Sequence, residues 1–143
     1  MSVFTPAESR WRYVIVPATL TAAVAHLPVI APHLDEAPYL GILFIVLASA
    51  CFVLGAALIS ADAPIVYLAA AVTCGLAMVG YVLTRTVAMP MIADDVGNWL
   101  EPLGVVSMLA EAVVVVSGIQ GWRTRSKTPH ATAAHRPLLT QAV

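Results

Sequence analysis

The sequence predicts an all-α protein in which four transmembrane helices form an antiparallel bundle, with both termini in the cytoplasm. Hydrophobic residues make up 60% of the 143 residues, charged residues make up 10%, and the mean hydropathy is +0.89. Soluble domains carry about 25% charged residues, so the composition argues against a water-soluble globule. Four apolar segments reach the length of about 20 residues that crosses a hydrocarbon layer. Six of the seven Lys and Arg residues lie in the first 12 or the last 21 positions of the chain.

The four predicted spans are separated by one short and two longer connections. The spans cover about 11–30, 38–60, 64–87 and about 100–121. Residues 61–63 leave room only for a tight turn, so the second and third spans are expected to be antiparallel neighbours. The connections 31–37 and 88–99 are longer and polar. Residues 1–127 form the predicted membrane domain, and 128–143 are predicted to be a disordered cytoplasmic tail because they are polar or small and lack periodicity.

Orientation follows from the basic residues. Arg10 and Arg12 precede the first span, whereas Arg123, Arg125 and Lys127 follow the fourth. By the positive-inside rule both ends are cytoplasmic, and the two longer connections lie outside. We therefore expect a multi-pass protein of the plasma (inner) membrane, with membrane lipids as partners. Nucleic acid is excluded as a partner because the basic residues form no continuous surface.

The first span has an alternative interpretation as a cleaved secretory signal. Basic residues precede its apolar run, and Ala23-Val24-Ala25 resembles a cleavage site. Pro17 inside the run, and apolar residues that continue to Ile30, favour a retained helix. Cleavage would remove one span and leave the topology of the others unchanged.

The two cysteines lie inside apolar runs, where neither a disulfide framework nor a thiolate metal site is expected. Counted from the ends of their spans, Cys51 and Cys74 sit at similar depth on neighbouring antiparallel helices. Two interpretations stay open. They are small packing residues, like the nearby Gly55 and Gly75, or they form a redox pair.

Glu111 is the most informative residue for function. It lies ten positions beyond Glu101, which places it ~15 Å deep, near the bilayer centre. It shares one predicted helix face with four residues at spacings of three and four, namely Gly104, Ser107, Val114 and Gly118. An acid at that depth costs at least ~2.5 kcal/mol unless it is neutralised, paired or hydrated. Glu111 is therefore either a proton, cation or ligand site, or a structural acid hydrogen-bonded to Tyr81 or Thr19.

The start of the fourth span has a capping signature. Asn98 is expected to cap the helix together with Glu101 three residues later, and Pro102 is tolerated in the first turn.

Arg85 is expected near the outer end of the third span, on one helix face with Tyr81. It is the only basic residue near the carboxylates of the two outer connections. We expect it to pair with Glu36 or Asp94 and so hold the outer loops on the bundle. Alternatively, Arg85 binds an anionic group, such as a lipid phosphate or a substrate carboxylate, in an outward-facing polar pocket. The residues expected to bind a ligand there are Arg85, Glu111, Glu36, Asp94, Asp95 and Tyr81.

A weaker pattern concerns a metal ion. His33 and Glu36 are three residues apart and His26 lies further in, so the three side chains could bind a divalent cation. Met89 and Met91 add soft ligands that suit copper. The alternative is that each histidine hydrogen-bonds a neighbouring group. No hydrolase motif or phosphate-binding glycine loop occurs in the sequence, so no enzyme class is indicated.

The segment 94–104, Asp-Asp-Val-Gly-Asn-Trp-Leu-Glu-Pro-Leu-Gly, with Arg85 before it and the stretch 26–41 further upstream, resembles small four-helix integral membrane proteins of actinobacterial type. The resemblance implies the four-span architecture and supplies no mechanism.

Several functions remain open at this point. The sequence favours a membrane binding or accessory protein that holds a small ligand, lipid headgroup or metal ion. Docking of a membrane-protein partner or a second copy on the outer loops would serve the same role. The alternatives are a proton-coupled transporter or membrane enzyme that uses Glu111, and a purely structural subunit.

Overall fold

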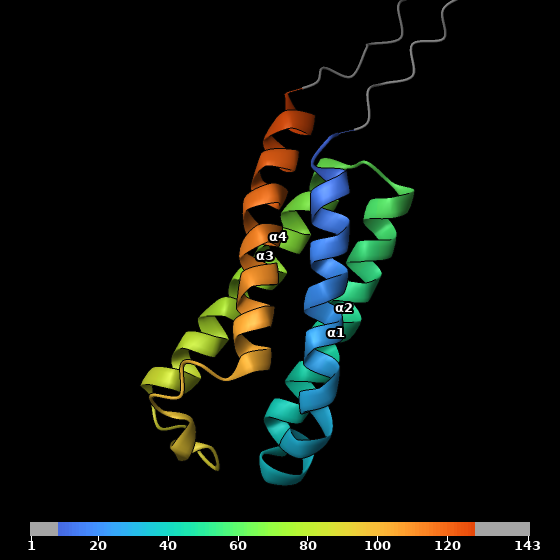
Figure 1. Ribbon diagram of the computed structural model, residues 1–143. Helices are drawn as coiled ribbons and strands as arrows, with labels where there is room; N and C mark the ends of the chain where they lie inside the picture. The colour runs from blue at the N-terminus through green and yellow to red at the C-terminus, as the bar shows by residue number, and fades with distance from the viewer. Residues whose placement is uncertain (1–8, 128–143) are drawn as a thin grey trace, which may run out of the picture.

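The computed structural model describes residues 9–127, which are helical apart from short connections. The elements are α1 (Arg12–Glu36), α2 (Pro38–Ser60), α3 (Pro64–Thr86), the short 3₁₀ helix η1 (Ala93–Asp95) and α4 (Pro102–Ser126) (Figure 1). Within the described range, the four α-helices are each long and apolar enough to cross a membrane. The predicted all-α, four-helix architecture is therefore confirmed, and it fits a multi-pass membrane protein. The predicted disordered tail, 128–143, lies outside the described residues.

Proline marks the start of three helices. Pro38, Pro64 and Pro102 each occupy the first turn of their helix. The first backbone N–H groups of a helix have no partner within it, so a residue without an N–H costs nothing there. Apolar length and these prolines together explain why the starts of α2 and α3 agree with the predicted spans.

The end of α1 differs from the prediction. The helix continues through Pro28 and Pro32 to Glu36, and Ala37 alone joins it to α2. The Ala37 N–H donates to the His33 carbonyl oxygen at 2.9 Å, which caps the last turn. The expectation of a polar loop over 31–37 is therefore wrong. Transmembrane helices tolerate internal proline, because neighbouring helices hold the turns in place.

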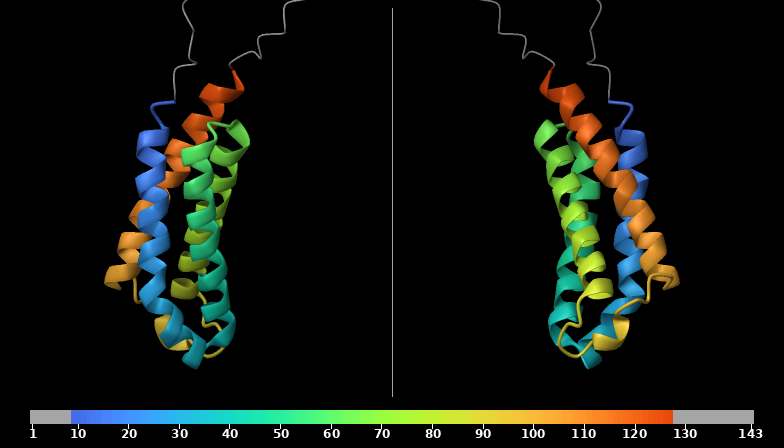
Figure 2. Two further views of the ribbon diagram at one scale, coloured as in Figure 1. Left: turned by 90° about the vertical axis from the view of Figure 1, so that its right-hand side faces the viewer. Right: turned by 90° about the vertical axis from the view of Figure 1, so that its left-hand side faces the viewer.

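The bundle is built from two closely packed helix pairs. α1 packs most extensively against α2, and α3 against α4, while α1 and α4 join the two pairs (Figure 2). A Cβ atom at Gly118 of α4 would lie 2.8 Å from the carbonyl oxygen of Tyr67, so the backbones of α3 and α4 approach closely there. The turn at 61–63 joins α2 to α3 as expected, but these two neighbours pack least against each other.

Both ends of the described chain lie at the same end of the bundle as the 61–63 turn, and the 88–101 connection lies at the opposite end (Figure 1). Asp62 connects the elements that meet at the end of the bundle with the 61–63 turn. Its carboxylate accepts from Arg125 at 2.7 Å, from the Tyr67 hydroxyl at 2.8 Å and from the Ser9 N–H at 3.1 Å. Arg125 Nε also donates to the Asp62 carbonyl oxygen at 3.2 Å. One turn residue thus ties α3, α4 and the segment before α1 together.

Candidate functional site

A histidine and a glutamate meet in the interior of the bundle. His26 Nε2 on α1 lies 3.3 Å from Glu111 Oε1 on α4, and the two side chains are 7% and 3% exposed. The expected partners of Glu111 are wrong, because Thr19 donates to the Ile15 carbonyl oxygen and Tyr81 donates to that of Trp99. α1 and α4 run antiparallel, which brings His26 to the depth of Glu111 and leaves Thr19 nearly two turns away.

The face of α4 that carries Glu111 points into the bundle as predicted. Ser107, Val114 and Gly118 are buried with it, and Gly104 is half-buried. The start of α4 differs from the prediction. Glu101 is itself the N-terminal capping residue, and its carboxylate accepts from the N–H groups of Leu103 and Gly104. The predicted box between Asn98 and Glu101 is therefore wrong, because the helix begins only at Pro102.

Two cysteines are buried in the core of the bundle. Cys51 of α2 and Cys74 of α3 are free, are 1% and 0% exposed, and belong to the same buried hydrophobic cluster. Each of the four helices thus contributes one chemically reactive side chain to the middle of the bundle.

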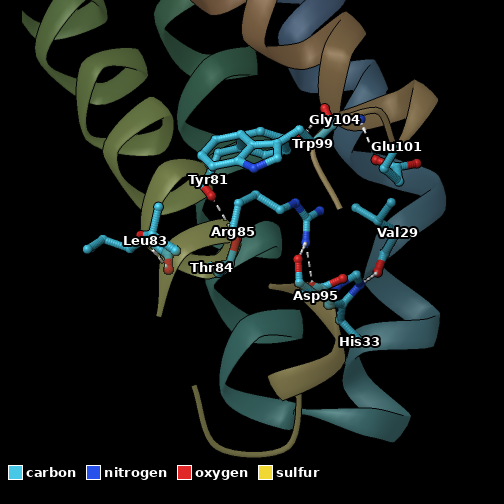
Figure 3. A network of polar contacts seen from close by, with 11 residues as sticks. Val29, His33, Tyr81, Leu83, Thr84, Arg85, Asp95, Trp99, Glu101 and Gly104 are labelled. Atoms are coloured by element: carbon cyan, nitrogen blue, oxygen red, sulfur yellow. Dashed lines mark hydrogen bonds and ion pairs between the residues drawn. The ribbon is translucent and has the colours of Figure 1, made fainter. Parts of the chain in front are cut away.

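Arg85 forms a second polar cluster, near the 88–101 connection (Figure 3). Its Nη1 lies 2.7 Å from Asp95 Oδ2, and its guanidinium carbon lies 4.8 Å from the centroid of the Tyr81 ring. The Gly97 N–H donates to the Arg85 carbonyl oxygen at 2.9 Å. The expected ion pair exists, but its predicted partners, Glu36 and Asp94, are wrong. Both of those residues are exposed, whereas η1 turns Asp95 inward.

The 88–101 connection also covers the end of the α1–α2 pair. Ile92 is 2% exposed and packs with Ala37 and Leu40, and the Tyr39 hydroxyl donates to the Pro90 carbonyl oxygen at 2.8 Å. The described part of the chain has an open cavity of about 310 Å³, and none of the residues expected to bind a ligand lines it. This cavity lies between α1 and α2 at the opposite end of the bundle, and its lining consists of Arg12, Tyr13, Val16, Pro17 and Ile59.

The residues of the expected metal site do not assemble. His26 faces Glu111, His33 Nδ1 lies 2.7 Å from the Val29 carbonyl oxygen, and Glu36 is exposed on the last turn of α1. Within residues 9–127, no three His, Cys, Asp or Glu side chains lie in an arrangement that could hold a metal ion. The prediction of a site at His26, His33 and Glu36 is thus not supported, because α1 separates His26 from His33 by seven residues, ~10 Å along the helix, and both histidines have other neighbours.

The two histidines share an aromatic neighbour instead. The rings of His26 and His33 both meet the Phe44 ring edge to face, with centroid separations of 5.4 and 4.9 Å. Phe44, from α2, therefore contacts both the buried His26 and the half-buried His33. Sequence reasoning missed this role, because Phe44 is one of many apolar residues in its span.

Comparison of the chain with protein-family models, with curated proteins and with solved structures gives no match. The resemblance to small four-helix membrane proteins of actinobacterial type stays a prediction. The functional argument depends on this chain's own residues.

Proposed function

We propose that this chain is a proton-coupled, multi-pass protein of the plasma membrane, in which His26 and Glu111 exchange the proton. The observation that carries the proposal is an acid and an imidazole 3.3 Å apart, 3% and 7% exposed, between two membrane-spanning helices. Ionisable side chains are costly at this depth, and within membrane proteins they typically mark proton or ion pathways. The charge pattern at the two ends of the chain supports an orientation with both ends in the cytoplasm.

The chemistry of the pair follows from its proton content. With one shared proton, His26 and Glu111 are either two neutral groups or an imidazolium beside a carboxylate. A second proton leaves a positive charge without a counter-charge, and loss of the shared proton leaves an unpaired negative charge. Both changes are costly in a water-poor interior. Uptake or release of a proton would therefore alter the packing of α1 against α4, which is the coupling that a proton-driven protein needs.

The arrangement around Phe44 supports access from the end that carries the 88–101 connection. His33 is half-buried and lies seven positions after His26 on the same face of α1, which is ~10 Å along the helix. A proton cannot pass directly over that distance, and the Phe44 ring contacts both imidazoles. Movement of this ring would let water connect the two histidines.

Proton flux into proteoliposomes tests the proposal. Vesicles loaded with a pH-sensitive dye are given a membrane potential, and the wild type should acidify them faster than empty vesicles do. Glu111→Gln and His26→Gln should each lower the protein-dependent rate at least tenfold, whereas Glu36→Gln, at an exposed acid of α1, should keep it. Equal rates for the wild type and Glu111→Gln, with both proteins folded by circular dichroism, would refute the proposal.

Phe44→Ala tests the access route separately. If the ring separates the two histidines, its removal should raise the flux, and the additional Glu111→Gln change should abolish that increase. An unchanged rate in Phe44→Ala, together with a loss in Glu111→Gln, would keep the proton site and reject this route.

A second candidate function, anion binding at Arg85, has one supporting observation. Arg85 is 8% exposed, and its Nε has no hydrogen-bond partner among the described residues. The buried Nε–H group is thus an unused donor, which an anionic lipid phosphate would satisfy. A binding or accessory role of this kind predicts that anionic phospholipid stabilises the wild type more than Arg85→Gln in a thermal unfolding assay.

A further inference from the structure

An open cavity lies between α1 and α2 at the end of the bundle that carries the 61–63 turn (Figure 1). Its volume is about 310 Å³, and binding sites for small molecules typically measure about 300–1,000 Å³. The cavity therefore has room for a molecule the size of a lipid headgroup. Its lining comes from the first two turns of α1 and the last turn of α2, and comprises Arg12, Tyr13, Val16, Pro17 and Ile59.

The lining changes from polar to apolar along the helix axis. Arg12 and Tyr13 begin α1, whereas Val16 and Pro17 lie one turn further along the helix, ~6 Å deeper in the membrane. Ile59 adds an apolar wall from α2. A phospholipid has the same order of groups, because its charged phosphate is followed by glycerol and then by acyl chains. A free anion would leave the apolar wall uncovered, so the lining favours a phospholipid.

Aromatic side chains mark the mouth of the cavity as the level of the lipid headgroups. Trp and Tyr gather at membrane–water interfaces. Trp11 and Tyr13 lie at the start of α1, and Trp122 lies near the end of α4, at the same end of the bundle (Figure 1). Further along, the exposed side chains of α1 and α2 include Val24 and Val53. The acyl chains of a lipid held in the cavity can therefore continue along apolar surface.

The charge at this end of the bundle favours an anionic headgroup. Among residues 9–127, one acid lies at this end, Asp62, and its carboxylate pairs with Arg125. Five cationic side chains lie at the same end, namely Arg10, Arg12, Arg123, Arg125 and Lys127. Guanidinium groups bind phosphate oxygens through two parallel hydrogen bonds. Because a guanidinium has five N–H donors, Arg12 can bind a phosphate in addition to its contacts within the protein.

We infer that the cavity between α1 and α2 is a binding site for one anionic glycerophospholipid. The phosphate binds the Arg12 guanidinium at the mouth, and the glycerol and the first acyl carbons lie against Val16, Pro17 and Ile59. The inference is independent of the proposed proton function and of anion binding at Arg85, because Arg85 lies at the opposite end of the bundle. Only the choice of leaflet depends on the proposed orientation, which assigns the lipid to the cytoplasmic leaflet.

Native mass spectrometry of the full chain in detergent tests the inference, because it counts bound lipids directly. The probes are phosphatidylglycerol and phosphatidylcholine with identical acyl chains. We expect the first phosphatidylglycerol to bind with a Kd at least about tenfold lower than that of phosphatidylcholine, the factor that a hydrogen bond to a charged group typically gives. Glycerol 3-phosphate carries the phosphate without acyl chains and should not displace the lipid. Displacement at equal concentration would overturn the assignment to a lipid.

Two matched pairs of variants locate the site. Arg12→Gln should raise the Kd for phosphatidylglycerol at least about tenfold. Arg123→Gln removes the same charge from an exposed residue outside the cavity and should change the Kd less than about threefold in physiological salt. Ile59→Trp fills the cavity without a change in charge and should also weaken binding about tenfold or more. Its control is Ile65→Trp, at an exposed position near the start of α3, which should bind like the wild type.

The tryptophan pair keeps the inference testable if Arg12→Gln does not fold, as judged by circular dichroism. The inference is overturned if the folded wild type binds the two lipids equally. It is also overturned if Arg12→Gln and Arg123→Gln weaken binding equally, or if Ile59→Trp binds as well as Ile65→Trp. Arg85→Gln should retain the lipid, and loss of binding in that variant alone would move the lipid to the opposite end of the bundle and reject this site.

Discussion

The contact between His26 and Glu111 should be measurable as a coupling energy in a double-mutant cycle. We choose His26→Phe and Glu111→Leu, because each replaces a polar side chain by an apolar one of similar size. The double variant then contains no buried polar group at either position. The cycle isolates the pair interaction if each single variant makes no new contact.

The distance between His26 and Glu111 limits the coupling energy that the cycle can give. At 3.3 Å, two unit charges attract by about 5 kcal/mol at an effective dielectric constant of about 20. Neutral hydrogen bonds between membrane helices give about 0.6 kcal/mol on average and about 1.7 kcal/mol at most. A coupling above about 2 kcal/mol would therefore indicate an imidazolium and a carboxylate, and one of about 0.5–1.7 kcal/mol would indicate a neutral pair. The double variant should be no less stable than either single variant, because it leaves no polar group unpaired.

Unfolding in mixed micelles, followed by circular dichroism as the denaturing detergent is increased, supplies the four free energies. A matched cycle uses Glu36→Leu in place of Glu111→Leu, because Glu36 lies on α1 and is exposed. This control should show no coupling with His26→Phe. A coupling in the His26–Glu111 cycle below about 0.3 kcal/mol, the usual error of additivity, would refute the contact and with it the argument for a shared proton.

Three further predictions concern the Arg85 ion pair, helix packing at two glycines, and the orientation of the chain in the membrane. Arg85→Ala should destabilise the protein by about 1–3 kcal/mol in the same unfolding assay, less than a fully buried pair would lose, because the Asp95 side chain is 25% exposed. Arg85→Lys should recover part of the loss and Asp94→Asn should have no effect, so an Arg85→Ala protein of unchanged stability would reject the ion pair. Gly121→Ala should cost about 2–4 kcal/mol, because its Cβ would overlap the buried Tyr67 ring, which the Asp62 hydrogen bond holds in place. Gly80→Ala, with nothing within 4 Å of the new Cβ, should instead gain up to about 1 kcal/mol in a helix; equal midpoints for the two glycine variants would contradict the packing. Finally, in the double background Cys51→Ser/Cys74→Ser, a cysteine placed at Asp94 should react with an impermeant maleimide from outside the cell and one placed at Lys127 should not, and the reverse pattern would overturn the orientation.

Some properties of this protein follow from residue order alone. Apolar length determines the four helices, because a backbone in hydrocarbon must satisfy its hydrogen bonds within each segment. Helical periodicity places Glu111 on the face of α4 that is buried with Ser107 and Val114. The depth of Cys51 and Cys74 also follows from counting along their spans, and in the structure both belong to one buried cluster. In each case the property depends on one helix, or on two helices joined by a short turn.

The polar partners were decided by tertiary structure. Periodicity gives the depth and face of a residue on its own helix, but not the rotation of the helix opposite. The partner of Glu111 is therefore His26, and the partner of Arg85 is Asp95. The first depends on how α1 and α4 pack side by side, and the second on one turn of 3₁₀ helix in the 88–101 connection.

Asp62 shows most clearly that a local sequence pattern does not predict contacts between different helices. In the sequence it is a lone acid in a three-residue turn, and its only nearby signal is Tyr67 five positions later. In the structure it joins α3, α4 and the segment before α1, because the ends of these elements meet at one end of the bundle. Contacts between residues as distant as Asp62 and Arg125 arise only when all four helices have packed, since no local pattern encodes which helix ends become neighbours.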